Sequence, residues 1–244
     1  FQRQDVERLF AVADQMEPYA LRKRVTRVLE GAILGNMFFE ASTRTRVSFG
    51  SAFNLLGGEV RETAGFENSA LVKGESLQDT ARVLSGFSDV ICMRHPQEGS
   101  VADFASASRV PVLNGGDGAN EHPTQALLDL YTIRQEIAAK GQTIDGLKVA
   151  MIGDLRHGRT VHSLSKLLSL YNSIQVTLVS PEELTLPDSI VEEPQRPSGQ
   201  ADVQRHTRKV CSGVVGRLGS ESDGLYEPLE NLSCRRTKHR RVAS

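Results

Sequence analysis

The sequence predicts an α/β protein with two doubly wound parallel-sheet domains. Apolar runs of strand length alternate with segments whose apolar residues recur at helical spacing, which is typical of parallel sheets covered by helices. The length of 244 residues exceeds that of a usual single domain. A polar segment from Lys140 to Gly146 separates two groups of elements, so we expect one domain over 1–139 and the start of a second over 140–193.

The first group begins with an apolar strand that ends near Phe39. A helix follows to Leu56, because its apolar residues keep helical spacing and two glycines end it. The later elements are a strand over 59–63, a helix from 76 to about 88, a strand over 89–93, a helix over 101–107, a strand over 110–113 and a helix over 124–139. The glycine-rich run 114–123 is predicted to be a turn that delivers His122 to the last helix.

The second group comprises a strand over 147–152, a helix over 160–171 and a strand over 174–179. From about Pro194 the strand and helix periods vanish, and the last 51 residues hold ten Lys and Arg against five Asp and Glu. We predict a disordered tail over 194–244 and attribute it to a reading-frame change near Glu193. A basic tail that binds nucleic acid is the alternative.

Composition favours a cytoplasmic protein with neither nucleic-acid nor membrane partners. The formal net charge is −1, no apolar stretch is long enough to span a bilayer, and the start shows no signal-peptide pattern. Three scattered cysteines predict neither a disulfide framework nor a metal site, and Cys92 is expected to be a core thiol. The first residue is Phe1 rather than Met, so we expect a processed, cropped or partial chain.

The junction of the first strand and helix predicts an anion site. A helix N-terminus offers unpaired N–H groups and a partial positive charge. Ser42, Thr43 and Thr45 add hydroxyl groups there, and Arg44 adds a planar fork that binds phosphate oxygens bidentately. Arg44 and Arg46 oppose the helix dipole, which indicates a bound anion. An ordinary capped helix with a solvated basic first turn is the alternative.

Five segments, in order, resemble the motifs of aspartate carbamoyltransferase catalytic chains, within the aspartate/ornithine carbamoyltransferase family. Residues 38–49 resemble the carbamoyl-phosphate signature, 73–76 the mobile-loop motif, 93–96 the second phosphate motif, 121–129 the carbonyl-binding motif and 153–160 the first substrate motif of the second domain. The resemblance covers roughly residues 1–193. The family's Arg-x-Gln and His-Pro-Leu-Pro-Arg-like motifs do not follow it.

The resemblance implies a complete carbamoyl-phosphate domain, a truncated aspartate domain, and a site that needs no cofactor and no metal. The implied carbamoyl-phosphate ligands are Ser42, Thr43, Arg44, Thr45, Arg94, His122 and Gln125, with Arg44, Thr45, Arg94 and His122 acting in catalysis. Lys73 and Arg159 would bind aspartate. Ser69 and Lys73 would reach into a neighbouring subunit's site, which implies a homotrimer with shared active sites. Attachment of regulatory chains is left open.

The function implied by the resemblance is carbamoyl transfer from carbamoyl phosphate to L-aspartate, in pyrimidine biosynthesis. Three alternatives stand beside it: a truncated chain that binds carbamoyl phosphate without turnover, an ornithine carbamoyltransferase, and a nucleotide-binding module. The last rests on Gly153 to Thr160, which differs from a Walker A loop by Arg159 in place of Lys. The segments Glu40-Ala41 and Ser48-Phe49 look like the aspartate enzyme rather than the ornithine enzyme.

Overall fold

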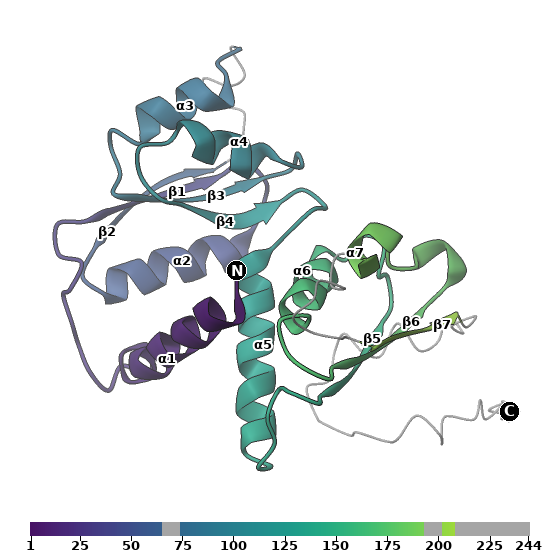
Figure 1. Cartoon of the computed structure of the whole chain (residues 1–244). Helices are drawn as coiled ribbons and strands as arrows, with labels where there is room; N and C mark the ends of the chain where they lie inside the picture. The colour runs from purple at the N-terminus through teal and green to yellow at the C-terminus, as the bar shows by residue number, and fades with distance from the viewer. Residues whose placement is uncertain (65–73, 193–201, 208–244) are drawn as a thin grey trace, which may run out of the picture. The chain divides into compact units, whose positions relative to one another are not determined.

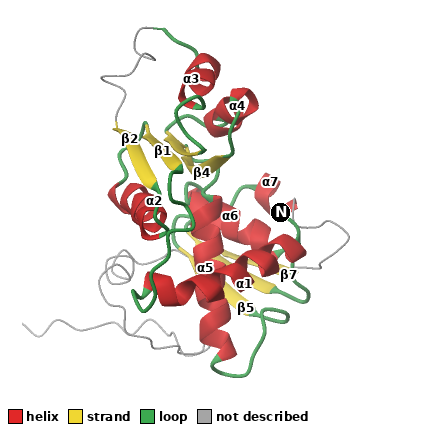
Figure 2. Ribbon diagram, turned by 90° about the vertical axis from the view of Figure 1, so that its left-hand side faces the viewer, coloured by secondary structure: helices red, strands yellow, loops and turns green. Residues whose placement is uncertain are grey.

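A computed structural model describes residues 1–64, 74–192 and 202–207, which contain two parallel sheets with packed helices (Figures 1 and 2). The first sheet has the strand order β2-β1-β3-β4, formed by β1 (Ile33–Phe38), β2 (Glu59–Ala64), β3 (Val90–His95) and β4 (Val112–Asp117). The second has the order β5-β6-β7, formed by β5 (Lys148–Ile152), β6 (Gln175–Ser180) and β7 (Asp202–Thr207). All pairs between these strands are parallel, which confirms the predicted α/β class.

Helices cover both faces of the first sheet (Figure 1). On one face α2 (Thr43–Leu55) packs Phe49 and Phe53 against Phe38. On the other face α3 (Leu77–Leu84) and α4 (Ser100–Ala107) bury Ala81 and Phe104 against the sheet. The remaining described helices after the first sheet are α5 (Pro123–Ala138), α6 (Arg159–Leu168), the 3-10 helix η2 (Glu182–Leu184) and α7 (Asp188–Glu192). The first sheet is therefore doubly wound.

An N-terminal helix, α1 (Arg3–Ala20), was not anticipated from the sequence. Its Val6 and Phe10 are buried, and the Phe10 ring meets Tyr131 of α5 edge-on at 5.4 Å between centroids. The same core includes Leu168 of α6 and Val176 of β6. The largest core thus crosses residues 139–140, where the domain boundary was predicted, and that boundary stays a prediction.

Arg3 ties α1 to the region of the second sheet. Its guanidinium donates to both carboxylate oxygens of Asp145, at 2.9 and 2.7 Å, and lies 4.7 Å from the centroid of the Tyr171 ring. Because 40% of the Arg3 side chain and 35% of the Asp145 side chain are exposed, solvent screens the pair. We expect Arg3→Met to lower the free energy of unfolding by about 1 kcal/mol. Urea unfolding checks this against Arg61→Met, which removes a more exposed pair with Glu59; equal losses in both variants would contradict it.

The predicted turn over 114–123 begins too early, because β4 continues to Asp117. Two of its glycines, Gly115 and Gly116, lie within β4 and mark close approach to neighbouring atoms rather than a turn. Gly116 has φ +134°, and a Cβ there would lie 3.0 Å from Nη1 of Arg94. The turn itself is confined to residues 117–121, where the Asp117 N–H donates to the Glu121 carbonyl at 3.1 Å.

Part of the predicted disordered tail forms a strand. Residues 202–207 make up β7, which pairs in parallel with β6, so the expectation is wrong for these six residues. The free edge of β6 offers unpaired N–H and C=O groups, which a polar segment can satisfy without an apolar period of its own. The rest of the tail lies outside the described residues.

Candidate functional site

Several predicted site residues come from the carboxyl edge of the first sheet. The chain runs from β1 outward to β2, then returns beside β1 as β3 and continues outward to β4. The carboxyl ends of β1 and β3 therefore form a topological switch point, where open α/β sheets bind ligands. Residues 40–45 follow β1, Arg94 lies near the end of β3, and His122 follows β4. This edge is the candidate site.

The start of α2 supplies donor groups to this edge. Ser42 is the N-cap residue in an extended conformation, and the helix begins at Thr43. Thr43 and Arg44 are exposed, whereas Ser42 and Thr45 are partly buried. Within the part of the chain that the structure describes, these four side chains form no hydrogen bond or ion pair. Together with the first-turn N–H groups they are available to an anion.

Arg94 provides a fixed, buried cation. Its Nε donates to Oε2 of Glu40 at 2.8 Å, and its Nη1 donates to the Gly115 carbonyl at 3.4 Å. Burial lowers the pKa of Arg94 from its ordinary value, and the neighbouring charge of Arg159 lowers it further. A guanidinium keeps its proton even so, and the strand end therefore presents a positive charge.

Arg159 reaches the same edge from the first position of α6. Its Nη1 donates to the Gly118 carbonyl at 2.5 Å and lies 3.6 Å from Oε2 of Glu40. The Glu40 carboxylate thus contacts two guanidinium groups, those of Arg94 and Arg159. Glu40 received no role from the sequence, because both of its partners are distant in the chain. An acidic residue just before an anion-binding helix start was the available signal.

His122 is buried beside this charged cluster. Its backbone N–H donates to Oγ of Ser163 at 3.1 Å, and its Nδ1 lies 3.3 Å from Oγ1 of Thr124. Burial lowers the pKa of His122 to about 4, with further lowering by the charges of Arg159 and Arg94. The imidazole is therefore neutral at pH 7, with one ring nitrogen able to donate and the other able to accept.

The depressed pKa of His122 predicts acid destabilisation. An unfolded histidine has a pKa near 6.5, so between pH 6.5 and 4 the unfolded chain binds more protons and the folded state loses stability as pH falls. From pH 8 to pH 5 this one group should lower the free energy of unfolding by about 2 kcal/mol. Urea unfolding at pH 8 and at pH 5 measures this. The drop in the free energy of unfolding between these pH values should be about 2 kcal/mol smaller in His122→Gln than in the wild-type protein. Identical losses in the two proteins would refute it.

The Gln125 side chain is not joined to the cluster. The Gln125 side chain donates to Oδ1 of Asp129 at 2.9 Å, one turn along α5. Ser69 and Lys73 lie outside the described residues. The structure therefore brings together Arg94, His122 and Arg159, and the roles of all the predicted residues stay predictions.

One face of α6 contacts the loop that carries His122. Arg159, Ser163 and Lys166 are spaced i, i+4 and i+7, so they share a face of the helix. Arg159 donates to the Gly118 carbonyl, Ser163 accepts from His122, and the Lys166 Nζ donates to Oε1 of Glu121 at 2.7 Å. The sequence indicated only Arg159. The helical spacing of three polar residues was the signal for the other two.

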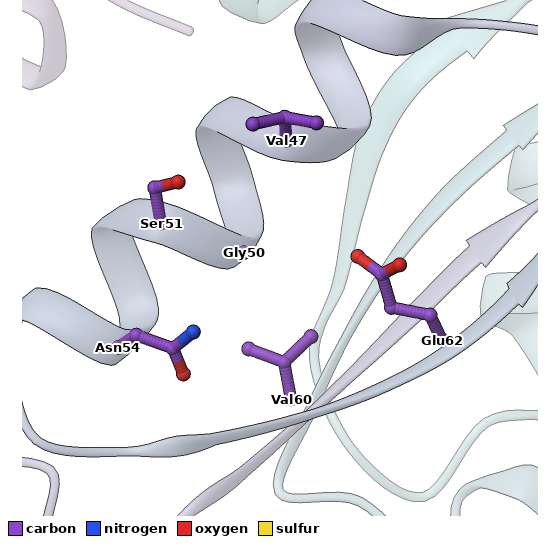
Figure 3. Close-up of a pocket in the computed structure, with 6 residues that line it drawn as sticks. All are labelled: Val47, Gly50, Ser51, Asn54, Val60 and Glu62. Carbon is purple, nitrogen blue, oxygen red and sulfur yellow. The ribbon is translucent and has the colours of Figure 1, made fainter.

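A groove of about 450 Å³ lies between α2 and β2 (Figure 3). Glu62 extends from β2 toward the helix, and its Oε1 accepts a hydrogen bond of 3.0 Å from Nδ2 of Asn36. The lining residues are Val47, Gly50, Ser51, Asn54, Val60 and Glu62. None of them belongs to the predicted site.

The loop over 153–160 does not favour the nucleotide-binding alternative. Oδ1 of Asp154 accepts the N–H groups of Arg156 and His157, at 3.1 and 3.0 Å. A phosphate-binding loop offers such N–H groups to its ligand, whereas here the protein's own carboxylate takes them. Arg159 points instead to Gly118.

Two negative findings apply to the described ranges 1–64, 74–192 and 202–207. They contain no group of three or more His, Cys, Asp or Glu residues that could hold a metal ion. None of the helices placed in these ranges has the length and apolar character needed to cross a membrane.

Comparisons with known proteins agree on one family. Residues 1–135 match the family described as aspartate/ornithine carbamoyltransferase, carbamoyl-P binding domain. The aspartate carbamoyltransferase catalytic subunit of Saccharophagus degradans is 77% identical over 192 residues, which are 79% of this chain and 57% of that protein. That of Archaeoglobus fulgidus is 48% identical over 219 residues, which are 90% of this chain and 72% of that protein.

A solved structure is also similar. It is the aspartate transcarbamoylase from Trypanosoma cruzi in complex with carbamoyl phosphate and aspartate, with a TM-score of 0.77 and 41% identity. The match covers 84% of this chain and 68% of that chain. This chain spans little more than half the length of the Saccharophagus relative.

Proposed function

We propose, since this chain belongs to the aspartate/ornithine carbamoyltransferase family, that it transfers the carbamoyl group of carbamoyl phosphate to the amino group of L-aspartate. The products are N-carbamoyl-L-aspartate and phosphate, in pyrimidine biosynthesis. One observation carries the proposal. Arg94, His122 and Arg159 converge around Glu40, directly before the open N-terminus of α2.

The phosphate group binds at the start of α2. The helix dipole and first-turn N–H groups favour an anion there. Arg44 is exposed and provides a bidentate fork, while Ser42, Thr43 and Thr45 provide hydroxyl groups. These donors hold the phosphate of carbamoyl phosphate and stabilise its charge as it leaves.

The carbamoyl carbonyl lies toward Arg94 and His122. Donors from these side chains and Thr45 polarise its oxygen, and the aspartate amino group attacks the carbonyl carbon. A tetrahedral intermediate forms and then expels phosphate, without a covalent bond to the protein. Catalysis consists of positioning and of charge stabilisation by groups that are already in place. Because His122 is neutral, its ring N–H can donate a hydrogen bond to the carbonyl oxygen without giving up a proton.

Substrate anions replace the internal carboxylate in this scheme. In the free protein the Glu40 carboxylate contacts the guanidinium groups of Arg94 and Arg159. When aspartate binds, one of its carboxylates replaces Glu40 as the partner of Arg159. Gln125 turns from Asp129 to bind the carbamoyl amide. Lys73 adds a second contact to aspartate.

The names of the relatives support aspartate over ornithine as acceptor. The Saccharophagus and Archaeoglobus proteins are aspartate carbamoyltransferase catalytic subunits, and the Trypanosoma enzyme is described with carbamoyl phosphate and aspartate bound. By the same relationship the chain forms a cytoplasmic homotrimer. Ser69 and Lys73 of one subunit then complete a neighbour's site.

Carbamoyl-phosphate binding without transfer is a second candidate. One observation favours it: the family's Arg-x-Gln and His-Pro-Leu-Pro-Arg-like motifs for aspartate do not follow residue 193 in this sequence. Arg159 is then the one predicted aspartate ligand among the described residues.

Binding and turnover, measured separately, test both candidates. Calorimetry with carbamoyl phosphate reports binding, and ¹⁴C-labelled carbamoyl phosphate with aspartate, ornithine or neither reports transfer. We expect saturable binding and a labelled product with aspartate alone. Binding without product selects the second candidate, whereas product from ornithine refutes the choice of acceptor. Saturable ATP binding without carbamoyl-phosphate binding would overturn the proposal.

A further inference from the structure

The loop that carries His122 is anchored at its near end within the first sheet. The buried carboxylate of Asp117 accepts the Gly99 N–H at 3.0 Å and the Asn120 side chain at 3.2 Å. These contacts fix the start of the loop against α4. The Asp117 N–H also donates to the Glu121 carbonyl at 3.1 Å, and His122 then leads into α5.

Helix α6 also holds the loop through three contacts of different character, one at Gly118 near its start and two at Glu121 and His122 at its far end. Ser163 accepts one neutral hydrogen bond from the His122 backbone. Arg159 donates to Gly118, yet under the proposed function this side chain exchanges its partners for a substrate carboxylate. Lys166 pairs with Glu121 at 2.7 Å, with about a third of each side chain exposed. The ion pair is therefore the charged contact that substrate binding leaves in place.

We propose that Lys166 is a positioning residue: through its ion pair with Glu121, the residue next to His122, it holds the His122 loop against α6 while Arg159 changes partners. The proposal deepens the proposed function, because it concerns the placement of the same imidazole. Lys166 touches no reacting atom in this scheme. Its effect passes through Glu121 and the backbone of His122.

The ionisation of His122 reports this placement without any substrate. Three charged groups act on the imidazole, Arg159 and Arg94 lowering its pKa and Glu40 raising it, while burial has the largest effect. Loosening the loop admits water, so the pKa should rise from about 4 toward the ordinary value near 6.5. NMR titration of the His122 ring Cε1–H in the full chain measures this.

Two single variants separate placement from simple charge effects. Removing the lysine charge in Lys166→Met raises a nearby histidine pKa by Coulomb's law, whereas removing the carboxylate charge in Glu121→Gln lowers it. A loosened loop raises the pKa of His122 in both variants. We expect a rise in both, and a value near wild type in Lys166→Arg and in the exchanged pair Lys166→Glu with Glu121→Lys. Lys148→Met is the matched control, since Lys148 is an exposed lysine on β5.

The outcomes are decisive in either direction. An unchanged pKa in Lys166→Met, opposite shifts in the two single variants, or an exchanged pair no better than the singles would each overturn the proposal. If Lys166→Met does not fold, Glu121→Gln and the exchanged pair carry the test. The titration needs no turnover, so it stands even if the proposed transfer fails. In an active protein, kcat should fall about 10- to 100-fold in Lys166→Met and recover in the exchanged pair.

Discussion

Replacing Arg94 by Met should lower the rate of carbamoyl transfer by about 10²- to 10³-fold, which corresponds to about 2.7 to 4 kcal/mol of transition-state stabilisation. Methionine keeps much of the aliphatic volume of the buried side chain but removes the charge and the donors. The carbonyl oxygen then loses a fixed cation at the end of β3, and Glu40 loses its 2.8 Å partner. Arg159 continues to balance Glu40, so we expect the chain to fold.

Steady-state kinetics with aspartate and carbamoyl phosphate measure this effect. Arg82→Met serves as control, because that guanidinium forms an exposed pair with Asp79 on α3. Circular dichroism of both variants establishes that they fold. Transfer at the control's rate in Arg94→Met would show that Arg94 has no part in the reaction.

Replacing Arg44 by Met should weaken carbamoyl-phosphate binding by about 10- to 100-fold, the expected cost of losing charged hydrogen bonds of roughly 1.5 to 3 kcal/mol. The side chain is exposed at the start of α2. Its removal therefore leaves the free energy of unfolding nearly unchanged. The loss should appear in binding and not in stability, unlike the loss expected for a core residue.

Calorimetric titration with carbamoyl phosphate checks the second prediction. Arg44→Lys is the matched variant, since it keeps the charge and removes the planar fork, and it should bind with intermediate affinity. If Arg44→Met bound carbamoyl phosphate as tightly as the wild type, Arg44 would not be a phosphate ligand. The proposal that the phosphate binds at the N-terminus of α2 would then lose its main support.

The fold could be predicted where local periodicity carried the information. The alternation of strands and helices predicted the parallel α/β class, and the helix after Phe39 begins at Thr43, beside the hydroxyl and guanidinium groups that indicated it. Glycine misled the prediction of β4, because Gly116 accommodates the Arg94 side chain across the sheet rather than a turn. Such a contact between neighbouring strands is invisible to a reading along the chain.

The site could be predicted less fully, because its charges are paired across the fold. Glu40, Ser163 and Lys166 are ordinary polar residues in the sequence. They become informative only when the fold places them against Arg94, His122 and Glu121. For the same reason β7 was missed, since its pairing depends on the free edge of β6 rather than on its own pattern.

A crystal structure of this chain with carbamoyl phosphate bound would show where the phosphate and the carbonyl oxygen lie. We expect the phosphate group at the first turn of α2 within hydrogen-bond distance of Arg44, and the carbonyl oxygen beside Arg94 and His122. Once aspartate is added, we expect a longer distance between Glu40 and Arg159 than the present 3.6 Å. A phosphate bound at the loop over 153–160, or in the groove between α2 and β2, would contradict the account.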